Sequence, residues 1–198
     1  KTDVKKKSKI KNIKKLYDAN WAGTTKSNQC TLILTEGDSA KAMAISGLAA
    51  IPNGTDIFGV FPLKGKLLNI RDASNKQIVE NEEFSNLKKI LGLNMGITYN
   101  NDNKSELRYG SILLMMDADV DGSHIKGLFF NMINYFWPSL MRLDGFIKAL
   151  ITPVVKAKNK KDQLSIKFNT LQEYEEWKKK QDTNLENINK WEIKYYKG

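Results

Sequence analysis

Four acidic residues have the types and spacing needed to hold a metal ion. Asp117, Asp119 and Asp121 stand at alternate positions in the run DADVDG, and Glu36 follows a separate apolar run earlier in the chain. Three carboxylates so close together repel one another unless a cation or protons intervene. Mg²⁺ suits such a group because it prefers one or two carboxylates together with water and phosphate oxygens. Alternate residues of an extended chain point to one side, so the sequence predicts a shared, open Mg²⁺ site.

Other interpretations of these acids remain open. An EF-hand loop also begins D-x-D-x-D-G, but its twelfth position needs a bidentate Glu and carries Leu128 here. The run is also entered from an apolar, strand-like segment rather than from a helix. An acidic surface turn without a metal is the second alternative for the three aspartates. Glu36 taken alone would equally be an acid favoured at a helix N-terminus, and Asp38 is expected chiefly to cap that helix.

The segment PLKGKLLNIR, at 62–71, has the composition of a turn that contacts phosphate. Lys64 and Lys66 flank a glycine, and Asn69 and Arg71 follow closely. A glycine lets the backbone approach a polyanion while the ammonium groups contact its phosphates. The alternative from composition alone is a solvated turn.

His124, the only histidine, comes just after the acidic run together with Lys126. We expect both in the first turn of a helix, where the N-terminus favours anions, although a lone histidine is commonly structural. The chain holds no Ser–His–Asp set and no Walker-type phosphate loop, so hydrolase and ATPase interpretations have no support.

The elements that would position these residues follow from the hydrophobic pattern. Continuous apolar runs predict strands, helical spacing predicts helices, and both acidic groups come at predicted strand ends. The alternation favours an α/β fold with a parallel sheet covered on both faces, whose polar sites gather beyond the carboxyl ends of the strands. The expected strands are 31–35, 57–63, 111–116 and 147–155, and the expected helices are 5–20, one beginning near Asp38, 75–93 and 123–143, the last interrupted at Pro138. In the tail, NTLQEYEEWKKKQ at 169–181 predicts a further helix and WEIKYYKG at 191–198 predicts a further strand.

Charge divides the chain into three parts. The net charge of +10 comes mostly from the ends, because residues 1–15 hold eight lysines and one aspartate, and residues 156–198 hold eleven lysines and seven acids. We expect a basic N-terminal segment over 1–28, either a solvated arm or a phosphate-binding one. A central domain over 29–155 and an α/β extension over 156–198 would follow.

Composition excludes several classes of protein. No stretch approaches the roughly 18 uncharged apolar residues of a membrane helix, so no membrane partner is expected. The chain starts at Lys1 and no apolar segment follows its basic start, so we expect no secretory signal. The single cysteine, Cys30, excludes an internal disulfide framework and cannot alone form a cysteine-rich zinc site.

Six segments carry a family likeness. They are TLILTEGDSAK at 31–41, VFPLKGKLLNIRDASNKQI at 60–78, MMDADVDGSHIKGL at 115–128, NYFWPSL at 134–140, ITPVVKAKNK at 151–160 and WEIKYYKG at 191–198. Together they resemble the TOPRIM domain of type IIA DNA topoisomerases, more in its eukaryotic or eukaryote-like viral form than in bacterial gyrase. The resemblance implies a Rossmann-like parallel sheet flanked by helices, with a small C-terminal α/β extension that leads to a winged-helix domain outside this chain.

The resemblance also implies an activity. In that family a tyrosine makes a transient double-strand break in one duplex for the ATP-dependent passage of another, and TOPRIM acids bind Mg²⁺ beside it. Glu36, Asp117 and Asp119 would be the catalytic and principal metal-binding acids, with Asp121 supporting them, and Glu36 would also act as general acid or base at the 3′-hydroxyl. The DNA-contacting residues would be Lys64, Lys66, Asn69, Arg71, His124 and Lys126.

The partners implied by the resemblance are double-stranded DNA, the remaining topoisomerase domains and, in the full-length enzyme, a second copy in a homodimer. The nucleophilic tyrosine and the ATPase domain lie outside this chain, so no ATP is expected here and the fragment alone is expected to be inactive. A cellular eukaryotic enzyme would be nuclear, and a viral one could act in the host cytoplasm. The alternatives are another TOPRIM nuclease or primase, and a calcium-binding or scaffold protein.

Overall fold

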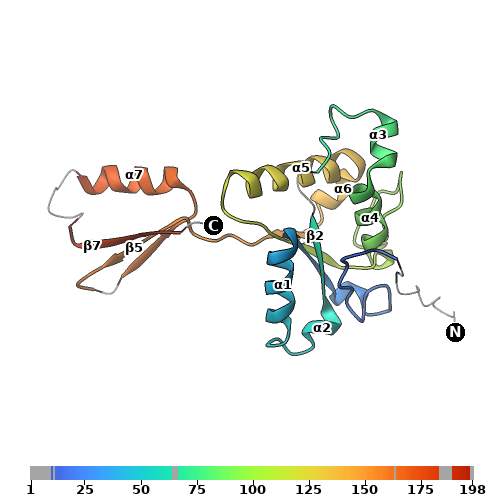
Figure 1. Ribbon diagram of the computed structural model, residues 1–198, viewed down its shortest axis with the longest axis horizontal. Helices are drawn as coiled ribbons and strands as arrows, with labels where there is room; N and C mark the ends of the chain where they lie inside the picture. The colour runs from blue at the N-terminus through green and yellow to red at the C-terminus, as the bar shows by residue number, and fades with distance from the viewer. Residues whose placement is uncertain (1–9, 11, 64–66, 163, 183–188, 197–198) are drawn as a thin grey trace. The chain divides into compact units, whose positions relative to one another are not determined.

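The computed structural model describes residues 10, 12–63, 67–162, 164–182 and 189–196, and the chain forms two compact units (Figure 1). The first unit comprises Lys1–Met116 and Gly122–Leu150, and the second comprises Asp117–Asp121 and Ile151–Gly198. Each unit has its own sheet and its own hydrophobic core.

A parallel four-stranded sheet forms the centre of the first unit. Its strands run in the order β2 (Phe58–Leu63), β1 (Thr31–Glu36), β3 (Ser111–Met115) and β4 (Ile147–Ala149), and every neighbouring pair is parallel. The α/β fold expected from the alternating pattern is confirmed. Pro62 lies inside β2 because β2 is an edge strand, where a missing backbone donor is tolerated.

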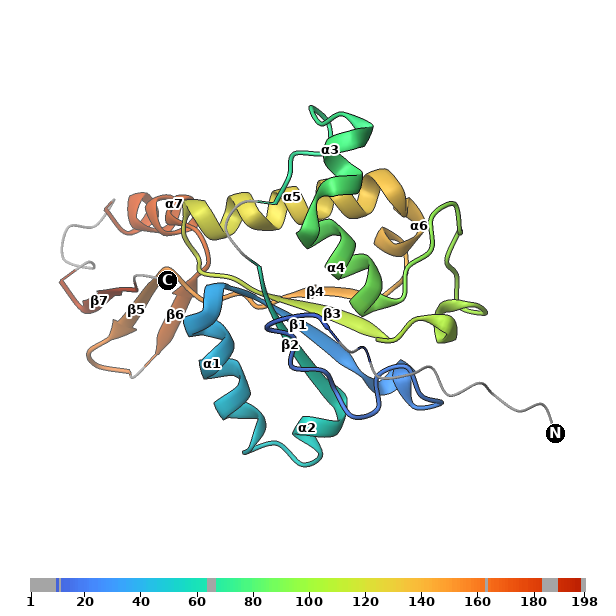
Figure 2. The ribbon, with the colours of Figure 1, turned by 45° about the vertical axis from the view of Figure 1, so that its right-hand side comes forward.

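Helices cover both faces of this sheet (Figure 2). Alternate β1 residues point to opposite faces, so Leu32 and Leu34 join the larger core while Ile33 packs with Ala44 and Leu48 of α1. The helices are α1 (Gly37–Leu48) and the short α2 (Gly54–Ile57) on one side, with α3 (Asn75–Glu80), α4 (Glu82–Leu91), α5 (Val120–Phe136) and α6 (Pro138–Met141) contributing to the larger layer. No helix in the described parts of the chain is long and apolar enough to cross a membrane.

Local signals explain why two expected helices are each divided in two. Asn81 ends α3 and caps α4, where its side chain accepts a hydrogen bond from the Phe84 N–H at 2.8 Å. Gly92, with a φ of 74°, ends α4 as expected. Pro138 stands at the first turn of α6, so the long helix expected over 123–143 is α5 followed by α6.

The helix expected over 5–20 is wrong for the residues that the structure describes there. Residue 10 and residues 12–20 are not helical, and Tyr17 instead forms an antiparallel bridge with Val60 of β2 through hydrogen bonds of 2.9 and 2.8 Å. Ile13 and Leu16 still pack against the larger core, so their apolar character reflects burial rather than a helical face.

A buried polar network fixes this N-terminal segment to the sheet. The Tyr109 hydroxyl donates to Asp18 and accepts from the Ala19 N–H at 3.1 Å, and Arg108 forms an ion pair with the same Asp18. Burial, reinforced by the charge of Asp18, raises the pKa of Tyr109 well above its ordinary value. The phenol therefore stays protonated and remains a donor to the carboxylate.

The second unit is a small antiparallel sheet with one helix. Its strands β5 (Val155–Asn159), β6 (Ser165–Phe168) and β7 (Trp191–Tyr195) lie in the order β6-β5-β7, and α7 (Leu171–Asp182) follows β6. Tyr174 and Trp177 of α7 pack in a core with Val155 and Phe168. The expected single strand 147–155 is wrong, because β4 ends at Ala149 in one unit and β5 begins at Val155 in the other.

Candidate functional site

The carboxyl ends of β1 and β3 form one edge of the first unit's sheet. The parallel register sets Thr35 beside Met115, so β1 ends at Glu36 where β3 ends at Met115. Glu36 is half-buried, and its Oε2 atom is shielded from solvent. Gly37 has a φ of 77°, which side-chain-bearing residues rarely adopt, and it turns the chain directly into α1. The expected position of Glu36 at a strand end is confirmed.

Asp117, Asp119 and Asp121 are exposed and follow β3 closely. The expected extended conformation of this run is wrong, because the chain bends at residues 118 and 119 and α5 begins at Val120. Asp121 therefore lies in the first turn of α5, where the helix dipole stabilises a negatively charged side chain. These aspartates belong to the second unit and Glu36 to the first.

The four acids can offer a metal ion only carboxylate oxygen atoms as ligands. Within the described ranges, no three His, Cys, Asp or Glu side chains are gathered into a ready-made metal cluster. Carboxylate oxygens are hard ligands, and Mg²⁺ commonly takes only one or two of them, completing its shell with water and substrate phosphate. The donor set therefore fits Mg²⁺ and does not fit zinc, which binds mainly Cys and His.

Asp38 does not cap α1 as the sequence suggested. The N-cap residue is Glu36, which makes no side-chain cap hydrogen bond, while Asp38 forms an ion pair with Lys15. This pair joins residues 23 positions apart and ties the N-terminal segment to the start of α1. No local sequence signal could have identified it.

The expected phosphate-contacting turn is described only in its second half. Lys64 and Lys66 lie outside the described residues. Asn69 and Arg71 are exposed, and the Asn69 side chain donates to Asp72 while its Oδ1 accepts from the Arg71 N–H at 3.4 Å. Asn69 thus helps to shape this turn, and Arg71 extends from it into solvent.

His124 and Lys126 lie one turn later in their helix than expected. α5 begins at Val120, so His124 stands in its second turn, where it is exposed, and Lys126 is half-buried. Ile125 and Leu128 fill the buried face of the same helix.

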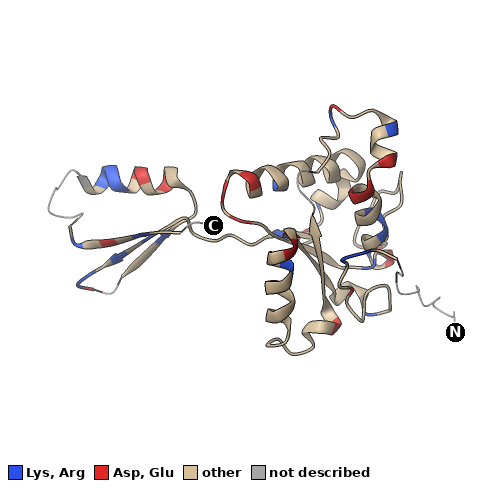
Figure 3. Ribbon diagram, viewed as in Figure 1, with Lys and Arg blue, Asp and Glu red and all other residues tan. Residues whose placement is uncertain are grey.

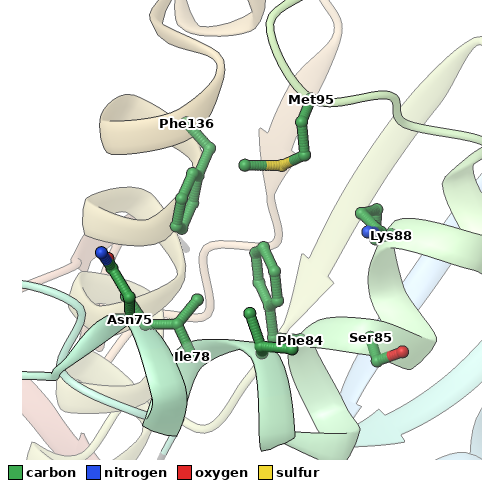
Figure 4. Close-up of a pocket in the computed structure, with 8 residues that line it drawn as sticks. Asn75, Ile78, Phe84, Ser85, Lys88, Met95 and Phe136 are labelled. Atoms are coloured by element: carbon green, nitrogen blue, oxygen red, sulfur yellow. The ribbon is translucent and has the colours of Figure 1, made fainter.

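The sequence did not predict an apolar pocket in the first unit (Figure 4). The pocket has a volume of about 220 Å³, and its walls come from α3, α4, the loop after α4 and the end of α5. Its lining holds one cation, Lys88, and no acid, so it is not the predicted metal site. The side chains that line it are Asn75, Ile78, Val79, Phe84, Ser85, Lys88, Met95 and Phe136.

Comparison with known proteins gives consistent matches along the chain. A model described as the Toprim domain matches residues 31–152, and one described as the C-terminal associated domain of TOPRIM matches residues 150–198. DNA topoisomerase 2-beta of Homo sapiens is 54% identical over 194 residues, 98% of this chain and 11% of the relative. DNA topoisomerase 2 of Bombyx mori is 54% identical over 199 residues, 100% of this chain and 12% of the relative.

A solved structure agrees with these matches. The crystal structure of the DNA-binding, cleavage and re-ligation domain of Plasmodium falciparum topoisomerase II superposes with a TM-score of 0.77 at 51% identity. The match covers 96% of this chain and 25% of that one. This chain thus spans a small part of the length of each protein that it matches.

Proposed function

Because this chain belongs to the Toprim family and matches the Toprim segment of eukaryotic DNA topoisomerase 2, we propose that it is the Mg²⁺-binding DNA-cleavage module of a type IIA DNA topoisomerase. The observation that carries this proposal is the parallel register of β1 and β3, in which β1 ends at Glu36 and β3 ends at Met115, two residues before the acidic run begins in the sequence. Ligand sites of open α/β sheets lie beyond the carboxyl ends of the strands. Another TOPRIM nuclease or primase loses support because the likeness to topoisomerase 2 spans the whole chain.

The acids would have complementary roles. Asp117 and Asp119, with Glu36, would be the principal Mg²⁺ ligands, and Asp121 would support them. When bound, Mg²⁺ supplies charge stabilisation at the phosphate and at the departing oxygen. Glu36, partly shielded from water, would hold or release the proton at the 3′-oxygen of the cleaved strand.

The basic groups would hold the strand to be cleaved. Lys64, Lys66 and Arg71 would contact phosphates as cations, and Asn69 would keep its turn in shape through Asp72. His124 and Lys126, which follow the acidic run in the sequence and lie in α5, would also contact phosphate.

The whole enzyme would supply what this chain does not carry. The nucleophilic tyrosine, the ATPase domain and most of the homodimer contact would come from other parts of the polypeptide, since the matched relatives are far longer than this chain. We infer a nuclear location for a cellular protein, and the host cytoplasm for a viral one.

The test is DNA cleavage by the complete enzyme that contains this chain. Glu36→Ala and Asp117→Ala should each reduce Mg²⁺-dependent plasmid cleavage by on the order of a hundredfold or more, because charge stabilisation or proton transfer is lost. Circular dichroism should show an unchanged fold. Asp102→Ala, which removes an exposed loop acid, is the matched control and should cleave normally. Ordinary cleavage by either of the first two variants would contradict the assignment.

A further inference from the structure

The outer face of the small sheet in the second unit carries a concentrated positive charge. In the β5–β6 register Lys156 stands opposite Lys167, and in the β5–β7 register it stands opposite Lys194. These three side chains therefore form one row across all three strands, and Lys158 lies two residues along β5 on the same side. We call Lys156, Lys158, Lys167 and Lys194 the lysine face. Figure 3 shows the Lys and Arg positions along the strands of this sheet in blue.

This face is the one that α7 does not cover. Tyr174 and Trp177 pack with Val155, Ala157 and Phe168, the residues that alternate with the lysines along the strands. Three of the four lysines are exposed and Lys156 is half-buried in the middle of the row. The helix thus fixes the sheet from one side and leaves the basic side open.

The positive charge of the lysine face is not offset by nearby acids, whereas the lysines of α7 are accompanied by glutamates. Like charges directly opposite each other on a sheet are destabilising. Among the described strand residues, Glu192, opposite Lys158, is the one acid on this face, and no ion pair found in the same part of the chain includes any of the four lysines. On α7, by contrast, Glu175 and Glu176 precede Lys179 and Lys180 by four residues, a spacing that favours pairing.

We propose that the lysine face binds the phosphate backbone of duplex DNA, as a surface additional to the residues of the cleavage site. Strands lie about 4.8 Å apart, so the row Lys167, Lys156 and Lys194 spans about 10 Å between its outer backbones. Duplex DNA carries one charge per about 1.7 Å of axis, so that span covers about six phosphate charges. A row of ammonium groups suits such a dense polyanion better than a single phosphate. The choice of duplex DNA as the polyanion rests on the proposed function. The alignment of the lysines on one face rests only on the strand register.

The test measures DNA binding without any metal. The 198-residue chain is titrated in EDTA against a fluorescent duplex of about two helical turns, between about 50 and 200 mM salt. The triple variant Lys156→Gln, Lys167→Gln, Lys194→Gln should weaken binding at least about tenfold and reduce the slope of log affinity against log salt by about three. The charge-matched control Lys178→Gln, Lys179→Gln, Lys180→Gln, on α7, should leave both nearly unchanged.

Two outcomes would overturn this inference. One is an equal loss in the sheet triple and the α7 triple, since total charge rather than the lysine face would then be responsible. The other is tighter binding of a glutamate-rich peptide of matched charge than of the duplex, which would assign the face to an acidic protein. A chain carrying Glu36→Ala and Asp117→Ala should still bind the duplex through the lysine face, so failure of the cleavage assignment is scored separately.

Discussion

Gly59 of β2 packs so closely against Tyr109 that there is no room for a β-carbon. A β-carbon at this position would lie 2.1 Å from the Tyr109 hydroxyl, which is already held by Asp18 and Ala19. Gly59→Ala should therefore lower the free energy of unfolding by about 1–3 kcal/mol, because the phenol must leave its buried partners. Urea unfolding monitored by circular dichroism measures this change.

The control for this effect is Gly127, in the middle of α5, where an added β-carbon meets nothing within 4 Å. Gly127→Ala should leave stability unchanged or raise it, since alanine favours a helix. Equal destabilisation by both substitutions would show that contact with Tyr109 is not the cause.

Cys30 gives a prediction about pH. Burial, with the charge of Asp18 adding to it, raises the pKa of the Cys30 thiol from 9.0 to about 11. The folded chain therefore keeps this proton in a range where the unfolded chain has lost it, so stability should fall as pH rises from about 9 towards 11. Because the chain has one cysteine, labelling with a thiol reagent at pH 8 should be slow in the folded protein and fast in urea. Rapid labelling of the folded chain would contradict the burial.

Site residues were predictable where they depend on local pattern. The apolar run before Glu36 identified its strand. Because polar sites of parallel sheets lie beyond the carboxyl ends of the strands, the polar residues that follow this run were expected at that edge. The ion pairs of Asp18 and Asp38 were not predictable, because their partners Arg108 and Lys15 are far away in sequence. The roles of the acids at a shared metal remain a prediction.

At the scale of elements, the boundary between α3 and α4 depends on Asn81. Asn81→Ala should cost about 1 kcal/mol of stability, because the Phe84 N–H loses its side-chain acceptor. Asn81→Asp should retain most of that stability, since aspartate caps equally well and favours the helix dipole. Thermal unfolding of the two variants compares them, and equal loss in both would argue against a capping role.

Strands buried on both faces were the easiest elements to predict. β1 and β3 are continuous apolar runs, and the structure places each within about a residue of the expected bounds. The N-terminal helix was wrong because Ile13, Leu16 and Tyr17 have helical spacing, yet they are buried by tertiary contacts. β6 was missed because a four-residue strand with alternating lysine carries little pattern.

At the scale of the whole molecule, the chain is expected to lack the activity of its relatives. The purified 198-residue chain should neither cleave nor relax supercoiled plasmid in Mg²⁺ and ATP, because it corresponds to 11–12% of the length of the matched topoisomerases. Gel electrophoresis of plasmid after incubation measures this, with the complete enzyme as positive control. Relaxation by the fragment would mean that it contains its own nucleophile.

The bridge between Tyr17 and Val60 has a consequence for solubility. β2 is an outer strand of the sheet, and an outer strand with free amide and carbonyl groups can recruit strands from other molecules and begin aggregation. Tyr17 occupies both backbone groups of Val60, and Pro62 offers no amide donor two residues further on. The segment before β1 thus protects this part of the β2 edge from pairing with strands of other molecules. Shortening the chain past Tyr17 would expose the Val60 backbone groups and should promote aggregation.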